Sequence, residues 1–277
     1  MAIENFSWTN SNNLRIQGRH WPVEKPKAVI SLVHGFGEHI GRYEHVAAYF
    51  NERNTAVIGY DRSGHGLSEG KRGHTKNYAV LLDEIGELIR QTRGRYPGAP
   101  LVLYGHSQGG NLALNYALRR EAGLSGIVTT GPWIKLAFEP SGFLVFLGKL
   151  TRMVYPAFSQ PNNLNADHLS TDAKVGKAYV ADPLVHNRVT SETGLSMIES
   201  GAYLDQYKGP FPCPLLLMHG GADQITSPEA TRKFASRLEG DVTLKIWDGL
   251  YHEIHNEYRQ AEVLDAIWSW MQAKVIP

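Results

Sequence analysis

Short apolar runs recur along the chain, separated by longer segments in which apolar residues return every three or four positions. The first pattern predicts buried β-strands and the second predicts amphipathic helices. The predicted strands are Ala28–His34, Ala56–Tyr60, Leu101–Tyr104, Gly126–Thr130, Leu215–His219 and Val242–Trp247, and helical spacing covers residues 78–89, 111–120 and 228–238. This alternation is typical of α/β proteins and predicts a mostly parallel central sheet with helices on both faces.

Two regions depart from this alternation. Residues 5–21 contain two polar, β-leaning segments around Asn10–Asn13, which predict a hairpin. Residues 132–210 are rich in Trp, Phe, Leu, Pro and Asn and contain no convincing central strand. We therefore expect a core domain formed by residues 1–131 and 211–277, with residues 132–210 inserted as a helical lid.

Residues 101–118, LVLYGHSQGGNLALNYAL, place Ser107 between a predicted strand and a predicted helix. Gly105 and Gly109 flank it at positions where side chains would collide with the neighbouring strand and helix. This pattern is typical of a nucleophile elbow, in which a strained turn presents a serine hydroxyl above a parallel sheet. We therefore predict that Ser107 is a catalytic nucleophile and that the protein is a serine hydrolase.

A second segment, Gly66–Gly70, fits the same G-x-S-x-G pattern around Ser68. It lies in a polar, glycine-rich loop with no strand leading directly into it, and charged residues follow it instead of a periodic helix. We therefore interpret Ser68 as a loop residue.

A serine nucleophile needs a base and an acid that orients the base, and both are predicted from the loops after the last strands. His252 lies in the loop after Val242–Trp247, and His255, one helical turn later, is its competitor. The favoured acid is Asp223, which follows the strand Leu215–His219. Asp248 is the alternative acid, although it lies on the same short turn as His252.

An oxyanion hole requires two backbone N–H groups. One is predicted to belong to Gln108, the residue after the nucleophile. The other is predicted to be that of Phe36, in the glycine-rich loop 34–37 after the first buried strand. The alternative interpretation of this loop is a glycine turn without a catalytic role.

Composition narrows the remaining possibilities. The chain has 277 residues and a net charge of +1, with no long basic run, so nucleic acid is not an expected partner. Cys213 is the single cysteine, which excludes an internal disulfide and a CxxC metal site. The predicted chemistry needs no metal and no cofactor. The first ten residues lack the features of a secretory signal, so we expect a cytoplasmic protein.

Four sequence blocks together resemble the monoacylglycerol lipase and lysophospholipase group of α/β-hydrolases, within the serine aminopeptidase-like family. They are HGFGEH with GRY (34–39 and 41–43), DRSGHGLSEG (61–70), GHS (105–107) and YHEIHNE (251–257), and DPL (182–184) adds to the likeness inside the lid. The resemblance implies an α/β-hydrolase fold with a helical lid. It also supports Ser107, Asp223 and His252 as the triad, with Phe36 and Gln108 as oxyanion donors.

The resemblance extends to the substrate. In monoglyceride lipases, the residues that match Glu38, Arg42 and His255 line the pocket for the glycerol hydroxyls. Without the resemblance, Glu38 and Arg42 are equally consistent with an ion pair at a helix start. Gln108 stands where many relatives have methionine, and it is expected to put a polar side chain beside the acyl group.

The lid contains one helix, predicted at residues 141–155, that is apolar on almost every side. Its main stripe consists of Phe143, Phe146, Leu147, Leu150 and Val154. We expect one face to cover the acyl chain. Outward residues such as Leu144 and Val145 would then face a membrane or micelle, with Lys149 and Arg152 near lipid phosphates. The alternative is a helix that only closes the core.

The sequence therefore predicts a serine hydrolase that cleaves lipid esters, with monoacylglycerol as the expected substrate and peripheral membrane contact through the lid. The alternatives are a lysophospholipase or a short-chain carboxylesterase. A non-catalytic ligand-binding protein of the same fold is disfavoured, because all triad positions carry competent residues.

Overall fold

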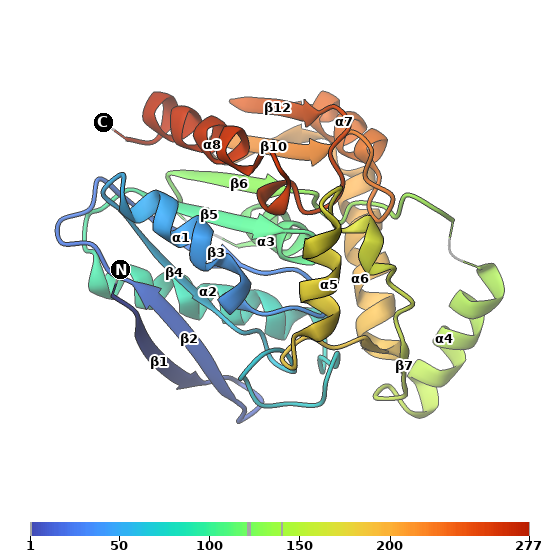
Figure 1. Ribbon diagram of the computed structural model, residues 1–277. Coiled ribbons are helices and arrows are strands. Elements are labelled where there is room, and N and C mark those ends of the chain that lie inside the picture. The colour runs from blue at the N-terminus through green and yellow to red at the C-terminus, as the bar shows by residue number, and fades with distance from the viewer. Residues whose placement is uncertain (1, 121–122, 140, 277) are drawn as a thin grey trace.

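The computed structural model describes residues 2–120, 123–139 and 141–276, and only the backbone of Leu144. Its central sheet contains eight strands in the order β1-β2-β4-β3-β5-β6-β10-β12 (Figure 1). Their bounds are β1 Glu4–Thr9, β2 Arg15–Trp21, β3 Ala28–Val33, β4 Thr55–Tyr60, β5 Leu101–His106, β6 Gly126–Thr130, β10 Leu215–Gly220 and β12 Val242–Trp247. Within this sheet, β4, β3, β5, β6, β10 and β12 pair in parallel, and β1 and β2 form the predicted antiparallel hairpin.

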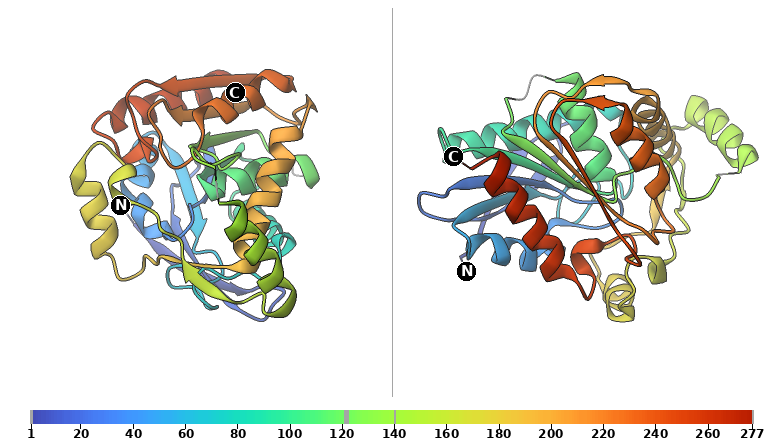
Figure 2. Two further views of the ribbon diagram at one scale, coloured as in Figure 1. Left: turned by 90° about the vertical axis from the view of Figure 1, so that its right-hand side faces the viewer. Right: turned by 90° about the horizontal axis from the view of Figure 1, so that it is seen from above.

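Helices cover both faces of this sheet (Figure 2). On one face, α2 (Tyr78–Arg95), α3 (Gln108–Arg119) and α7 (Pro228–Arg237) enclose an apolar core. On the other face, η1 (Ile40–Tyr43), α1 (Glu44–Asn51) and α8 (Gln260–Lys274) enclose a second core. The predicted α/β architecture is therefore confirmed.

The burial of β12 differs from the expectation of a buried strand. Only Trp247 at its end is buried, and Lys245 is exposed. The reason is its position, because β12 pairs with β10 alone and forms an edge of the sheet. An edge strand with a lysine on it is protected from pairing with other chains.

Most of residues 132–210 lies beyond the carboxyl ends of the parallel strands (Figures 1 and 2), whereas the end of this range packs beside α3 and returns to the amino end of β10. They contain α4 (Gly142–Val154), η2 (Ala166–His168), α5 (Ala173–Ala181) and α6 (Ser191–Gln206), with a small antiparallel ribbon of β7 (Ser159–Pro161) and β8 (Arg188–Thr190). A further two-stranded ribbon pairs β9 (Gly209–Pro210) with β11 (Leu238–Glu239), and η3 (Ile254–Asn256) precedes α8. None of the strands inside 132–210 joins the central sheet.

Helix α4 packs on α6 through a face that we did not predict. Thr151 Oγ1 lies 2.7 Å from Ser191 Oγ, and Arg152 forms ion pairs with Glu192 and Glu199 at 2.9 and 2.6 Å. The main apolar stripe of α4 is exposed, as are Met153 and Tyr155.

The predicted orientation of α4 was therefore wrong. Val145, expected to face outward, is half-buried. Arg152, expected near lipid phosphates, is held by glutamates. The side chain of Leu144 lies outside the described part of the structure. When a helix is apolar on almost every side, its sequence does not indicate which side faces the rest of the protein. In the structure, polar side chains of α4 bond to α6.

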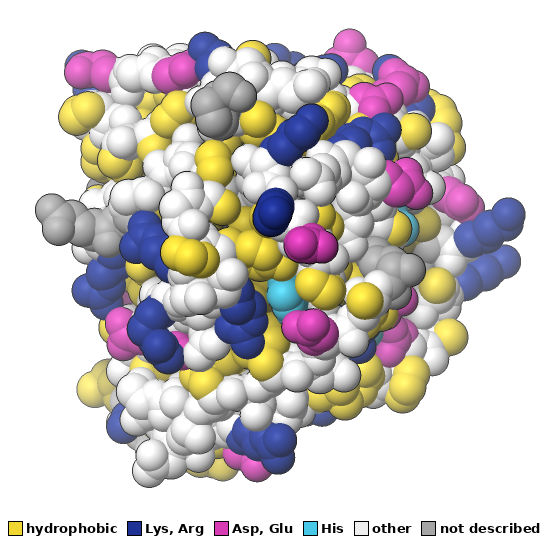
Figure 3. Space-filling model, turned by 90° about the vertical axis from the view of Figure 1, so that its left-hand side faces the viewer, with side chains coloured by type: hydrophobic (Ala, Val, Ile, Leu, Met, Phe, Trp, Pro, Cys, Tyr) yellow, Lys and Arg dark blue, Asp and Glu magenta, His cyan; other side chains and the backbone are white. Residues whose placement is uncertain are grey.

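The surface opposite the lid carries basic and acidic side chains side by side (Figure 3). This distribution fits the small net charge of the sequence. Within the described residues, no helix is both long enough and apolar enough to cross a bilayer.

Candidate active site

Ser107 occupies a sharp turn between β5 and α3. Its backbone has φ +55° and ψ −117°, a conformation that a non-glycine residue adopts only under strain. A Cβ at Gly105 would lie 2.2 Å from the carbonyl oxygen of Gly109, and one at Gly109 would lie 2.1 Å from that of Val33. Both positions thus require glycine, so that α3 can approach β5 and β3 this closely.

A chain of hydrogen bonds runs through Ser107, His252 and Asp223. Ser107 Oγ lies 2.9 Å from His252 Nε2, and His252 Nδ1 lies 2.7 Å from Asp223 Oδ2. All three side chains are buried. Asp248, the alternative acid, is exposed on the turn after β12. The loops after β5, β10 and β12 thus bring together the three residues predicted as the triad.

Asp223 is held by several donors in addition to His252. The backbone N–H groups of Ile225 and Thr226 donate to Oδ1 at 2.7 and 3.1 Å, and Thr226 Oγ1 lies 2.9 Å from Oδ2. His219 Nε2 lies 3.0 Å from the same oxygen. Burial raises the pKa of Asp223, but the His252 charge and these hydrogen bonds outweigh it and hold the pKa well below its ordinary value. The carboxylate therefore stays ionised beside His252.

Burial alone would lower the pKa of His252. The Asp223 charge and hydrogen bond outweigh burial, with smaller contributions from Glu253 and Glu38, and the net pKa is raised. A raised pKa keeps the imidazolium form until higher pH, so a proton accepted from Ser107 would be stabilised.

This shift predicts the pH dependence of ester hydrolysis. His252 must be neutral to accept the serine proton, so kcat/KM should rise with pH through a single ionisation centred above 6.5, the ordinary value for histidine. Initial rates on a p-nitrophenyl ester between pH 5 and pH 9 measure the midpoint. Glu253→Gln, which removes one negative charge near His252, should move that midpoint to lower pH. A midpoint below 6.5 in the unmodified protein would contradict this assignment.

The loop after β3 runs directly against the nucleophile. A Cβ at Gly35 would lie 3.3 Å from Ser107 Cβ. Among the described residues, the backbone N–H groups of Phe36 and Gln108 have no hydrogen-bond acceptor. Two N–H donors beside a serine oxygen can stabilise the negative charge that develops on a carbonyl oxygen under attack.

The side chain of Gln108 differs from the sequence-based expectation. Instead of lying free beside an acyl group, its Oε1 accepts a hydrogen bond of 2.7 Å from Arg62 Nη1. Both residues are buried.

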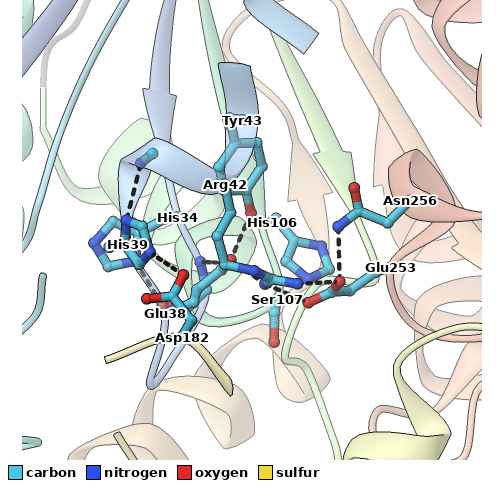
Figure 4. A network of polar contacts seen from close by, with 12 residues as sticks. His34, Glu38, His39, Arg42, Tyr43, His106, Ser107, Asp182, Glu253 and Asn256 are labelled. Carbon is cyan, nitrogen blue, oxygen red and sulfur yellow. Dashed lines mark hydrogen bonds and ion pairs between the residues drawn. The ribbon is translucent and has the colours of Figure 1, made fainter. Parts of the chain in front are cut away.

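Glu38 and Arg42 belong to a buried ion network (Figure 4). Arg42 Nη1 lies 2.6 Å from Glu38 Oε2, and its two terminal nitrogens lie 2.7 Å from the two carboxylate oxygens of Glu253. The other oxygen of Glu38 accepts from the Gly35 N–H at 2.6 Å and from the Tyr43 hydroxyl at 2.7 Å. The Arg42 charge holds the pKa of Glu253 at about 2 against the effect of burial.

Sequence reasoning missed Glu253. Its adjacency to His252 in the YHEIH block was the available signal, but nothing in local spacing pairs it with Arg42, 211 positions away. The network therefore connects the loop before α1 to the loop that carries His252.

The side chain of His255 is completely buried and does not contact solvent. Its ring stacks on Tyr43 with centroids 5.0 Å apart and packs edge-on against His106 at 4.7 Å. Neither ring nitrogen has a hydrogen-bond partner among the described residues. Burial, followed by the neighbouring charges, holds its pKa well below the ordinary value, so the ring is neutral.

Ser68 has a structural environment of its own. Its hydroxyl donates to the carbonyl oxygen of Asp61 and accepts from the Gln17 N–H at 2.8 Å. These bonds hold the 61–70 loop against β2. They leave Ser68 without a contact to His252 or Asp223 among the described residues.

The lid is tied to the loop after β3. His39 Nε2 lies 2.8 Å from Asp182 Oδ2, and the His186 N–H donates to the carbonyl oxygen of Gly37 at 2.8 Å. The ring of Tyr179 faces the guanidinium of Arg42 at 4.9 Å. These contacts explain the position of the DPL motif, whose aspartate links lid and core. Within the described residues, no cluster of three potential ligands is arranged to hold a metal ion.

A family model described as "Serine aminopeptidase, S33" matches residues 24–259. The chain belongs to this hydrolase family. It is 34% identical to a monoacylglycerol lipase of Mycolicibacterium smegmatis over 96% of this chain and 95% of that protein. It is also 37% identical to an uncharacterized abhydrolase domain-containing protein of Dictyostelium discoideum, over 99% of this chain but only 29% of that longer protein.

Among solved structures, the crystal structure of Paleococcus ferrophilus monoacylglycerol lipase superposes with a TM-score of 0.82. The two chains are 30% identical, and the match covers 99% of this chain and 100% of that one. The resemblance to monoacylglycerol lipases inferred from the sequence blocks is therefore confirmed, and so is the α/β-hydrolase fold.

Proposed function

We propose that this S33 family member is a monoacylglycerol lipase, which hydrolyses a monoacylglycerol to a fatty acid and glycerol. The observation that carries the proposal is the hydrogen-bonded chain from Ser107 through His252 to Asp223 on a nucleophile elbow. The similarity to monoacylglycerol lipases over nearly the whole chain supports the substrate class.

In the proposed mechanism, neutral His252 takes the hydroxyl proton as Ser107 Oγ attacks the ester carbonyl carbon. The oxyanion accepts hydrogen bonds from the Phe36 and Gln108 N–H groups, and Asp223 stabilises the imidazolium. His252 then protonates the departing alcohol oxygen. A water molecule, activated in the same way, cleaves the acyl-enzyme and releases the fatty acid.

A panel of p-nitrophenyl esters of increasing chain length tests this proposal against the short-chain carboxylesterase alternative. A lipase should gain in kcat/KM with acyl length, because each buried methylene contributes about 0.8 kcal/mol. A preference for acetate over longer chains would favour the carboxylesterase instead. A fluorophosphonate probe that failed to label the protein would favour a non-catalytic ligand-binding role.

We further propose that Glu38, Arg42 and His255 shape the subsite for the glycerol hydroxyls. The side chain of Arg42 is 11% exposed, and its hydrogen bonds to Glu38 and Glu253 leave its Nε–H and one Nη2–H for a substrate hydroxyl. His255 is fully buried and stacks on Tyr43, whose hydroxyl binds Glu38. It would therefore act by supporting the Glu38 side of the subsite.

Arg42→Lys should lower kcat/KM for monoacylglycerol about tenfold or more, because a lost charge-assisted hydrogen bond is worth about 1.5–3 kcal/mol. Lysine keeps the positive charge between the two buried glutamates, whereas alanine would leave them unpaired. A p-nitrophenyl ester of the same fatty acid lacks the glycerol hydroxyls and should be much less affected. Equal losses on both substrates, with a lowered Tm, would assign Arg42 a structural role only.

We also propose that the lid contacts a membrane or micelle surface, through the exposed apolar face of α4. Six exposed residues define this face: Phe143, Phe146, Leu147, Leu150, Met153 and Val154. Such an exposed group is unusual on a soluble monomer and fits burial among lipid acyl chains, with Lys149 near the headgroups. A cytoplasmic location with reversible membrane contact remains a prediction.

Replacing Phe143, Phe146 and Leu150 together by serine should reduce co-sedimentation with phosphatidylcholine liposomes and the turnover of long-chain monoacylglycerol. These side chains are exposed, so Tm and the hydrolysis of dissolved p-nitrophenyl acetate should change little. The matched control is Val180→Ser, an exposed apolar residue on α5. Unchanged sedimentation of the triple variant would reject the interfacial role.

A further inference from the structure

Arg62, which follows Asp61 at the end of β4, has an unusual environment. Its side chain is buried, yet among the described residues no carboxylate lies within ion-pair distance of its guanidinium. Burial lowers its pKa, which reflects the cost of placing this charge away from water. The energetic cost of an unpaired buried cation calls for a role that neutral residues could not fill equally well.

The two terminal nitrogens of this guanidinium contact the two parts of the chain that carry the proposed oxyanion donors. Nη1 donates to Gln108 Oε1 at 2.7 Å, and Nη2 donates to the carbonyl oxygen of Gly35 at 2.6 Å. Gln108 supplies one N–H of the oxyanion hole. The Gly35 carbonyl belongs to the same peptide unit as the Phe36 N–H, which supplies the other.

Because the peptide bond is planar, the contact of Arg62 with the Gly35 carbonyl also orients the Phe36 N–H. In a trans peptide, C=O and N–H point in opposite directions, so fixing the carbonyl of Gly35 also fixes the direction of the Phe36 N–H. His34 holds the same carbonyl oxygen from a second side, because its Nδ1 lies 2.7 Å from that oxygen. Its Nε2 accepts a hydrogen bond of 3.0 Å from the backbone N–H of Arg62. Burial and the Arg62 charge hold the pKa of His34 well below its ordinary value, so one tautomer of the neutral ring satisfies both contacts.

We propose that Arg62 is a positioning residue that clamps both halves of the oxyanion hole, one arm on the Gln108 side chain and the other on the Gly35–Phe36 peptide. The inference rests on the oxyanion assignment made under the proposed function. A cationic donor on the Gly35 carbonyl also polarises that peptide and strengthens the Phe36 N–H as a donor. The clamp links the loop after β3, the loop after β4 and the elbow after β5.

The test uses Arg62→Lys, Arg62→Met and Gln108→Met, with a p-nitrophenyl butyrate assay that requires no particular lipid headgroup. Arg62→Met should lower kcat about tenfold or more, with KM within about twofold, because the oxyanion forms only after substrate binding. The inhibition constant of an alkyl trifluoromethyl ketone, whose adduct places an oxyanion in the hole, should rise by the same factor. The pH midpoint assigned to His252 should not move.

The remaining variants keep the inference testable if Arg62→Met does not fold. Gln108→Met retains the backbone N–H and breaks only one arm, so a smaller loss of the same kind is expected. Arg62→Lys and Gln108→Met should be non-additive when combined, because they break the same hydrogen bond. Arg95→Met removes a half-buried arginine at the end of α2, whose guanidinium bonds to Gln91 on the same helix and faces the Phe6 ring. It is the matched control and should keep full activity.

Endpoint labelling with a fluorophosphonate separates positioning from folding. If the kcat loss disappears once rates are divided by the labelled fraction, or if KM rises while kcat is unchanged, the clamp is rejected. If the unmodified protein is not labelled at all, the proposed hydrolase function fails, whatever Arg62 does.

Discussion

Ser107→Ala is expected to abolish nearly all ester hydrolysis, with kcat reduced by a factor on the order of 10⁵. The oxyanion donors and the substrate contacts remain in this variant, so a small residual rate over that in water should persist. Alanine accommodates the strained backbone at this position no worse than serine does, and Tm should stay close to that of the unmodified protein. Initial rates on p-nitrophenyl butyrate and a thermal melt measure the two effects.

Ser68→Ala is the matched control, because Ser68 lies in the same G-x-S-x-G pattern and is also buried. Its hydroxyl links the Asp61 carbonyl to the Gln17 N–H, so its loss should cost about 1–2 kcal/mol of unfolding free energy. Activity per folded molecule should remain near that of the unmodified protein. An inactive but folded Ser68→Ala variant, with an active Ser107→Ala variant, would overturn the assignment of the elbow.

His252→Ala should lower kcat by a factor of about 10⁴ to 10⁶, since Ser107 would lose its only base within hydrogen-bond distance among the described residues. His255→Phe provides the comparison. The His255 ring packs between aromatic rings, and its nitrogens have no hydrogen-bond partner among the described residues, so phenylalanine should preserve the packing. Its hydrolysis of p-nitrophenyl butyrate should fall less than tenfold, with any larger loss confined to monoacylglycerol. Equal losses from both substitutions, at equal Tm, would contradict this division of roles.

The parts of the site that could be predicted from the sequence are those fixed by local backbone geometry and by strand order. Gly105 is required by a close backbone contact with Gly109 inside the turn, and Gly109 by one with Val33 on the neighbouring strand, so their spacing around Ser107 indicates the elbow. Asp223 and His252 lie directly after β10 and β12. Parallel strands deliver their following loops to one edge of the sheet, which makes the convergence of these residues predictable.

The parts that could not be predicted depend on contacts between distant segments. The bidentate pairing of Arg42 with Glu253 leaves no local periodic signal, and neither does the hydrogen bond from Arg62 to Gln108. The orientation of α4 was wrong for a related reason. Thr151 and Arg152 form a hydrogen bond and an ion pair to α6, and an apolar pattern cannot reveal such polar contacts.

The similarity to monoacylglycerol lipases suggests that one substrate, a monoacylglycerol, contacts both the catalytic serine and the Glu38–Arg42 pair. In the proposed mechanism, Ser107 and the N–H groups of Phe36 and Gln108 act on the ester carbonyl. Glu38, which accepts from the Gly35 N–H and from Arg42, is proposed to act on the glycerol hydroxyls. The loop after β3 contributes to both parts of the site, because it carries Phe36, a proposed oxyanion donor, and Glu38, proposed for the glycerol subsite, two positions apart. A lysophospholipase would instead have to accommodate a charged phosphate beside the two buried glutamates.

The ratio of kcat/KM for 1-monooleoylglycerol to that for 1-oleoyl-lysophosphatidylcholine, measured with the same acyl chain and detergent, separates the proposed monoacylglycerol lipase from a lysophospholipase. We expect a preference for the glycerol ester of about tenfold or more, because the two glutamates of the Glu38–Arg42–Glu253 network repel the negative phosphate. Equal or higher turnover of the lysophospholipid, by protein that a fluorophosphonate labels fully, would contradict it.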